Sequence, residues 1–162
     1  MKILITGGKS ATALKLLKAF TEHEMVLADY DEVPSFSSAA YRFVSLGAKN
    51  EDTLAHTLLN NCLDENVAAI LPLHDFEIEA LAKATILFKE FNIEVLLPNQ
   101  GDLMQYLNSK KSTNWAVFNH GNLIFATEPN ETLIALAQAT HLNGAYYVSE
   151  DDGQLNLALI TI

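Results

Sequence analysis

The sequence is poor in cysteine, basic residues and long apolar runs. Its one cysteine, Cys62, can form neither an internal disulfide bond nor, by itself, a zinc site. The apolar runs are about four to eight residues long, well below the roughly 18 that a membrane-spanning helix needs. Residues 1–8 lack the longer apolar stretch and the small-residue cleavage site of a signal peptide. We therefore expect no membrane segment and a cytoplasmic location.

Acidic residues outnumber basic residues by two to one. The 162 residues include 10 Lys and Arg against 20 Asp and Glu, which gives a formal net charge of −10. A chain with this charge repels nucleic-acid phosphates and anionic membrane surfaces, so we expect neither as a partner. The length is typical of about one domain with a single core.

The segment after Lys111 contains no basic residue at all. It does contain five acidic residues, which are Glu128, Glu131, Glu150, Asp151 and Asp152. Nucleotide phosphates are normally held by Lys or Arg side chains and by magnesium bound to carboxylates. A triphosphate would meet repulsion on this segment, so we expect no bound cofactor.

Strands and helices alternate along residues 1–98. Short β-branched and aliphatic runs predict buried strands, and apolar residues at helical spacing predict helices between them. The expected strands are residues 3–5, 25–28, 41–44, 67–71 and 93–97, and the expected helices are residues 11–22, 51–63 and 76–91. This alternation predicts an α/β fold with a Rossmann-like parallel sheet and helices on both faces.

The pattern changes after Pro98. Asp151, Asp152 and Gly153 are typical of a tight turn between two antiparallel strands. The expected elements are short helices at residues 100–107 and 110–118, a strand at 123–126, a helix at 132–141 and strands at 145–149 and 155–162. We therefore expect a Rossmann-like domain over residues 1–118 and a small helix and hairpin over residues 119–162.

A glycine turn follows the first expected strand. Gly7, Gly8, Lys9 and Ser10 stand where a strand meets a helix N-terminus, a position that favours a small anion. Asp29 lies about 20 residues further on, as in dinucleotide-binding domains, although the spacing G-x-G-x-x-G is not met. A third interpretation is that the glycines only permit a tight turn and close packing of the helix on the sheet. The sequence leaves all three open.

A second polar cluster follows a central strand. His74, Asp75 and Glu77 come shortly after Pro72, at the edge where open parallel sheets bind ligands. An imidazole beside a carboxylate can serve acid–base chemistry near neutral pH. The alternative is structural, because Asp75 can cap the next helix and Glu77 can interact with its positive end.

The sequence shows no metal-binding pattern. The remaining histidines, which are His23, His56, His120 and His141, show no ligand spacing among themselves or with Cys62. Cys62 lies on an apolar helical stripe, which predicts a buried core thiol rather than a nucleophile. We therefore expect no metal site.

Several segments together resemble one known family. Besides the glycine turn, they are VLADYD at 26–31, AILPLHDFE at 69–77, IEVLLPN at 93–99 and NSKKST at 108–113. Their order and spacing are similar to those of the N-terminal, pre-ATP-grasp domain of ATP-grasp ligases of the carbamoyl-phosphate synthase large-chain type. The resemblance implies a Rossmann-like domain that contributes to substrate binding.

The resemblance becomes thinner beyond Phe118. Residues 145–149 are similar to a strand that normally ends in an ATP-binding lysine, but the matching position here is Ser149. The rest of the grasp fold, with its second lysine and magnesium ligands, has no counterpart within these 162 residues. We therefore expect a truncated grasp subdomain and no autonomous ligase activity.

These observations predict a non-catalytic binding or interaction module for a small anionic or amino-acid-like ligand. The candidate ligand-binding residues are Gly7, Gly8, Lys9, Ser10, Asp29, His74, Asp75 and Glu77. One alternative is the substrate-binding half of a split ATP-grasp ligase that a separate chain completes. Another is an NAD(P)-binding reductase-like protein, which is less favoured because Tyr30 and Tyr41 have no suitably spaced lysine.

The last expected strand, residues 155–162, is apolar on both faces and carries no charge or proline. Such a strand at the edge of a sheet pairs readily with another chain. We expect it to be covered either by the chain's own Rossmann-like part or, as the preferred alternative, by a second copy in a two-fold dimer.

Overall fold

A computed structural model describes all of residues 1–162. The chain forms two compact units. The N-terminal unit comprises Met1–Val95 together with Thr161–Ile162, and the C-terminal unit comprises Leu96–Ile160. The division expected after Phe118 falls inside strand β6 (Trp115–Asn119), because this strand pairs with later strands of the C-terminal unit.

The N-terminal unit contains a five-stranded parallel sheet. Its strands are β1 (Lys2–Ile5), β2 (Glu24–Asp29), β3 (Tyr41–Ser45), β4 (Ala69–Leu71) and β5 (Glu94–Val95). They lie in the order β3-β2-β1-β4-β5, and every neighbouring pair is parallel. The expected Rossmann-like sheet is therefore confirmed. In this order β1 lies between β2 and β4, so the carboxyl ends of these three strands meet at one edge.

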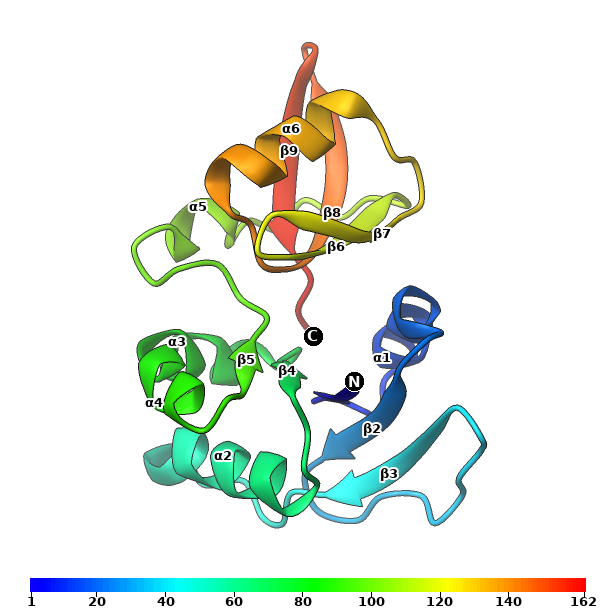
Figure 1. Cartoon of the computed structure of the whole chain (residues 1–162), viewed down its shortest axis with the longest axis vertical. Helices are drawn as coiled ribbons and strands as arrows, with labels where there is room; N and C mark the ends of the chain where they lie inside the picture. Colours follow the sequence, from blue (N-terminus) through cyan, green and yellow to red (C-terminus); the bar gives the residue numbers. More distant parts are fainter. The chain divides into compact units, whose positions relative to one another are not determined.

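Helices cover both faces of this sheet. They are α1 (Ala11–Leu16) with the 3₁₀ turn η1 (Leu17–Phe20), η2 (Glu51–Thr53) with α2 (Leu54–Asp64), and α3 (Asp75–Lys83) followed by α4 (Thr85–Glu90). Figure 1 shows α1 on the opposite side of the sheet from α2 and α3. The single helix expected at residues 76–91 is in fact two helices, because the backbone leaves the helical conformation at Ala84.

The core of the N-terminal unit is built from residues of the central strands and the inner helix faces. Leu4, Val26 and Ile70 on the strands are completely buried, as are Leu58 and Cys62 on α2. The expectation that Cys62 is a core thiol is confirmed. Burial raises the pKa of this thiol to about 12, which keeps it protonated and unreactive at neutral pH.

The C-terminal unit contains a four-stranded antiparallel sheet with one main helix. Its elements are α5 (Leu103–Tyr106), β6, β7 (Asn122–Ala126), α6 (Glu131–Thr140), β8 (Gly144–Asp151) and β9 (Gln154–Leu159). The strand order is β7-β6-β8-β9, and α6 lies along one face of the sheet (Figure 1). None of the helices in the protein is both long enough and apolar enough to cross a membrane.

Two-residue turns connect β6 to β7 and β8 to β9. The central residues of the first turn, His120 and Gly121, have φ of 49° and 80°, and those of the second, Asp152 and Gly153, have φ of 50° and 78°. Positive φ at both central positions is the geometry of hairpin turns whose twist matches that of the strands. The sequence predicts the second turn correctly.

The helix expected at residues 110–118 is wrong. Residues 115–119 form strand β6, which pairs with β7 on one side and β8 on the other. A short apolar run does not by itself distinguish a strand from a helix. Here the His120–Gly121 turn decides, because it folds β7 back onto the run.

Strand β9 is shorter than expected and is an edge strand. It ends at Leu159, and Thr161 and Ile162 belong to the N-terminal unit. Leu157 and Ile160 are only 6% and 1% exposed in the single chain. These apolar side chains are therefore covered without a second copy of the protein.

Candidate functional site

The candidate site lies at the carboxyl edge of the parallel sheet. Strand β1 leads into the glycine turn, β2 ends at Asp29, and β4 leads through Leu73 to His74. Because β1 pairs with both β2 and β4, these segments meet although they are far apart in the sequence. This is the edge at which open α/β sheets bind their ligands. We refer to it as the rim.

Both glycines of the turn are required by the packing of the rim. Gly7 has a φ of +64°, which favours glycine. A Cβ atom on Gly8 would lie 2.7 Å from the carbonyl carbon of Leu27, so only glycine lets the turn approach β2 this closely. These contacts support the interpretation of a tight turn with close packing on the sheet.

The backbone amides of the turn are already used within the protein. The amides of Gly8, Lys9 and Ser10 donate hydrogen bonds to the Ala28 carbonyl at 2.9 Å, to Asp29 Oδ2 at 3.1 Å and to the Gly7 carbonyl at 2.9 Å. The Ser10 hydroxyl caps α1 by accepting a hydrogen bond from the Ala13 amide. An anion at this turn would compete with these bonds and meet the Asp29 carboxylate, so the turn offers no open phosphate cradle.

Asp29 and His74 form the central polar pair of the rim. His74 Nε2 lies 2.9 Å from Asp29 Oδ1, which also accepts a hydrogen bond from the Tyr30 amide. Burial acts to raise the pKa of Asp29, but the hydrogen bonds from His74 and from the Lys9 and Tyr30 amides outweigh it and lower this pKa. The carboxylate therefore stays ionised and orients the imidazole. The side chain of His74 is 19% exposed, and its Nδ1 has no partner in the chain.

Glu77 is a buried hydrogen-bond acceptor beneath the surface of the rim. Its side chain is completely buried and accepts hydrogen bonds from the Thr6 hydroxyl at 2.5 Å and the Tyr30 hydroxyl at 2.6 Å. The Thr6 hydroxyl in turn accepts a hydrogen bond from the Leu73 amide at 2.8 Å. Burial raises the pKa of Glu77 although the two hydroxyl groups oppose this shift. Burial and the negative charge of Glu77 also raise the pKa of Tyr30.

Asp75 does not make the capping hydrogen bond considered for it, whereas Glu77 lies in the first turn of α3, at the positive end of the helix, as considered. His74 is the N-cap residue of α3, and no side chain donates or accepts a capping hydrogen bond there. Asp75 is exposed on the first turn of the helix. Glu77 points inward to Thr6 and Tyr30 instead of lying at the helix surface. The carboxylate that contacts His74 is therefore that of Asp29, not those of the neighbouring Asp75 and Glu77.

Sequence reasoning missed two groups that lie beside His74. The ring of Phe76 stacks on the His74 imidazole, with ring centroids 4.8 Å apart. Lys49 Nζ lies 3.8 Å from the centroid of the Phe76 ring, a cation–π contact. Lys49 follows β3, whose carboxyl end also lies at the rim. Its position could therefore have been predicted from the strand order. The polar groups of this part of the rim thus include an imidazole, the Lys49 ammonium group, which is also paired with Glu51 at 3.2 Å, and the Lys9 ammonium group, which donates to the Tyr30 and Glu32 carbonyls.

Ile162 occupies the other part of the rim. Its amide donates a 2.8 Å hydrogen bond to the Leu73 carbonyl, and its carbonyl accepts one of 3.1 Å from the Asp75 amide. Its side chain lies over Gly7, where a Cβ atom would be only 2.5 Å from Ile162 Cδ1. Ile162 thus covers Gly7, and both glycines of the turn are buried, whereas His74 is partly exposed.

The structure contains no cluster of three or more His, Cys, Asp or Glu side chains that could hold a metal ion.

Comparisons with known proteins agree with the fold of the N-terminal unit. The family described as PylC-like, N-terminal domain matches residues 3–96, which confirms the resemblance to a pre-ATP-grasp domain. Among solved structures, the chain is similar to the urea amidolyase of K. lactis, with a TM-score of 0.50 and 13% identity over 96% of this chain and 13% of that chain. It is also similar to the urea carboxylase of Kluyveromyces lactis, with a TM-score of 0.51 and 12% identity over 96% of this chain and 19% of that chain.

At these identities the two structures show a shared fold alone. The chain spans 13% of the length of the first enzyme and 19% of the length of the second. A search of curated proteins finds no match to this sequence.

Proposed function

The chain belongs to the PylC-like N-terminal domain family through residues 3–96, and on this premise we propose that it is a non-catalytic pre-ATP-grasp module that binds a small ligand. The ligand is a small carboxylate or an amino acid. It binds on the accessible part of the rim, around His74, and not over the glycine turn.

The observation that carries this proposal is the Asp29–His74 pair. The buried Asp29 carboxylate contacts Nε2 of the partly exposed His74 imidazole at 2.9 Å and fixes the orientation of the ring. The Nδ1 atom on the other side of the ring can therefore form a hydrogen bond with a ligand. The ammonium groups of Lys9 and Lys49 lie on the same edge, where Lys9 donates to the Tyr30 and Glu32 carbonyls and Lys49 is paired with Glu51 at 3.2 Å. Their remaining N–H groups are the donors that a carboxylate ligand would use.

The absence of ATP-dependent catalysis is proposed from the composition of the C-terminal unit. Residues 112–162 contain no Lys or Arg, and Ser149 stands where the resemblance would place an ATP-binding lysine. Without cationic side chains this segment cannot neutralise a triphosphate. The NAD(P)-dependent reductase is not proposed, because the amides of the glycine turn are engaged within the protein.

Ligand binding is tested by thermal-shift screening of amino acids and small carboxylates, followed by calorimetric titration of the compounds that raise the melting temperature. His74→Ala and Lys9→Ala should each weaken binding by about tenfold, which corresponds to about 1.4 kcal/mol. His56→Ala and Lys18→Ala are the matched controls, because both residues are exposed and remote from the rim contacts described above. Equal binding by all four variants would contradict the proposed site.

Catalysis is tested by titrating the protein with magnesium and ATP and by assaying phosphate release. We expect neither micromolar affinity nor hydrolysis. A dissociation constant in the micromolar range or tighter would overturn the non-catalytic part of the proposal, while leaving ligand binding at the rim to be judged by the variants.

The second candidate is the substrate-binding half of a split ATP-grasp ligase. It is favoured by the small share, 13% and 19%, of the structurally similar enzymes that this chain spans. In this case the chain alone should not hydrolyse ATP, but addition of a separate chain that carries the grasp domain should start hydrolysis. His74→Ala should then reduce that activity, whereas His56→Ala should not.

A further inference from the structure

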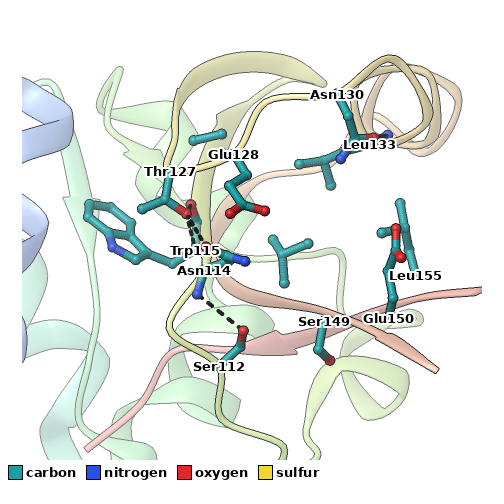
Figure 2. A pocket seen from close by; sticks show the side chains of 12 residues that line it. Ser112, Asn114, Trp115, Thr127, Glu128, Asn130, Leu133, Ser149, Glu150 and Leu155 are labelled. Carbon is teal, nitrogen blue, oxygen red and sulfur yellow. Dashed lines mark hydrogen bonds between the residues drawn. The ribbon is translucent and has the colours of Figure 1, made fainter.

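The last two strands of the C-terminal unit form a hairpin with an exposed tip. Strands β8 and β9 pair as far as Asp151 and Gln154. Figure 1 shows that the tip of this hairpin extends beyond α6. Glu150, which precedes the tip, lines a cavity of about 330 Å³ within the unit (Figure 2), but Asp152 and Gly153 do not line it. These two residues face solvent instead.

Asp152 and Gly153 form the one Asp-Gly linkage of the sequence. Nothing lies within 4 Å of the Cβ position of Gly153. The Asp152 carboxylate forms no ion pair or hydrogen bond, and the Gly153 amide donates no hydrogen bond within the chain. Exposed tips of this kind open locally at little cost in free energy. The Asp152 side chain can therefore rotate towards the Gly153 nitrogen.

This linkage can rearrange without an enzyme, a metal or an oxidant. The Gly153 nitrogen attacks Cγ of the protonated Asp152 side chain, and the lost hydroxyl group leaves as water with the amide proton. Glycine favours this attack because it has no Cβ atom that obstructs the approach. Water then opens the cyclic imide. When water breaks the bond between the main-chain carbonyl carbon of Asp152 and the Gly153 nitrogen, the chain continues through the side chain and Asp152 has become isoaspartate.

The one Asn-Gly linkage, by contrast, is held by the fold. Asn143 Oδ1 accepts a 2.5 Å hydrogen bond from the His120 amide, and the Asn143 carbonyl accepts one from the Tyr146 hydroxyl. Gly144 is buried and pairs with Phe118 in the sheet. In an unfolded peptide at neutral pH an Asn-Gly linkage cyclises faster than an Asp-Gly linkage, because a carboxamide is a better electrophile than an ionised carboxylate. The folded chain should reverse this order.

We propose that Asp152 is a site of spontaneous isoaspartate formation in the folded protein and that the fold protects Asn143 from the corresponding deamidation. Isoaspartate adds one carbon atom to the main chain and leaves a free α-carboxylate on the turn. The two-residue turn, which has positive φ at both central residues, is then lost, and the Asp151–Gln154 pair opens. The modified tip becomes a substrate for carboxyl methyltransferases that transfer a methyl group from S-adenosylmethionine to this carboxylate.

The experiment follows both linkages by mass spectrometry while the protein is incubated at neutral pH, in native buffer and in urea. Chymotrypsin is used for digestion, because no Lys or Arg follows Lys111. Electron-transfer fragmentation identifies isoaspartate, and an increase in mass identifies deamidation of Asn143. In native buffer we expect isoaspartate to accumulate at Asp152 while Asn143 stays intact. In urea, Asn143 should react first, because its hydrogen bonds are lost.

Two variants test the chemistry at the tip. Asp152→Glu should rearrange at least about tenfold more slowly, because its cyclic intermediate needs a six-membered ring. Asp151→Glu is the matched control, since it makes the same change one position earlier and keeps the Asp-Gly linkage; it should react as fast as the unmodified protein. If Asp152 forms no isoaspartate in native buffer, the turn protects the linkage and the proposal is wrong. Deamidation of Asn143 ahead of Asp152 in native buffer contradicts it as well. Neither result depends on ligand binding at the rim.

Discussion

His74 Nε2 lies 2.9 Å from Oδ1 of Asp29, and these residues are held by strands that do not pair with each other. Asp29 ends β2, and His74 follows β4, while β1 lies between the two strands. Parallel strands on both sides of β1 place their carboxyl ends at one edge, so the pair is a direct result of the strand order. The buried Glu77 below it joins β1, β2 and α3 through Thr6 and Tyr30.

Asp29→Asn should weaken the fold as well as the orientation of His74. The change removes the charge that strengthens the hydrogen bonds from His74 and the Lys9 amide, so we expect a loss of about 1–3 kcal/mol at neutral pH, measured by urea unfolding. Because the pKa of Asp29 is lowered in the folded protein, its stabilisation is present above its ordinary value of 3.8. The difference between the two proteins should therefore shrink as the pH falls below this value. Asp64→Asn, at an exposed position of α2, should change stability by less than about 0.5 kcal/mol.

Glu77→Gln should remove a loss of stability that occurs as the pH rises, whereas Asp29→Asn removes a gain. Burial raises the pKa of Glu77 in the folded state, so the unmodified protein loses stability as the pH rises from the ordinary value of 4.5 through the raised pKa. The amide variant does not ionise and should lack this loss. Urea unfolding between about pH 4 and pH 8 compares the two proteins over this window. If the free energies of unfolding of the two proteins change in parallel across that window, the raised pKa of Glu77 is contradicted.

Gly8→Ala should destabilise the N-terminal unit by about 1–3 kcal/mol, because a Cβ atom 2.7 Å from the Leu27 backbone forces the turn away from β2. A larger substitution such as Gly8→Val would disturb the fold itself, so it cannot report on ligand access. Gly101→Ala is the control, since nothing lies within 4 Å of its Cβ position. Thermal unfolding should show a clear loss for the first variant and a change near zero for the second.

Leu157→Lys should lower stability without dissociating an oligomer. Leu157 on β9 is 6% exposed in the single chain, so a lysine there places a charge in the core of the C-terminal unit. Gln154→Lys, at the exposed start of the same strand, should be close to neutral. Light scattering, together with thermal unfolding, measures both effects. A dimer of the unmodified protein that Leu157→Lys converts to a stable monomer would instead favour the two-fold interface expected from the sequence.

Local sequence patterns were sufficient to predict the alternation of strands and helices in the N-terminal unit and the family resemblance. Continuous aliphatic runs such as residues 3–5 and 25–28 identify strands that are buried on both faces, and the burial of Leu4 and Val26 follows from this local signal. The Asp152–Gly153 turn was predictable for the same reason, because its backbone preference is local.

Which of the candidate residues contact one another could not be read from local patterns, because these contacts are long-range. Asp29 and His74 are 45 positions apart, Thr6 and Glu77 are 71 apart, and no local pattern pairs them. The position of Ile162 over Gly7 and the cavity between Glu128 and Glu150 likewise depend on long-range packing. Helix and strand propensity and hydrophobic periodicity act over a few residues. The contacts at the rim depend instead on the order of the strands in the sheet and on the return of the C-terminal residues to it. The sequence therefore predicted which residues lie at the rim but not how they contact one another.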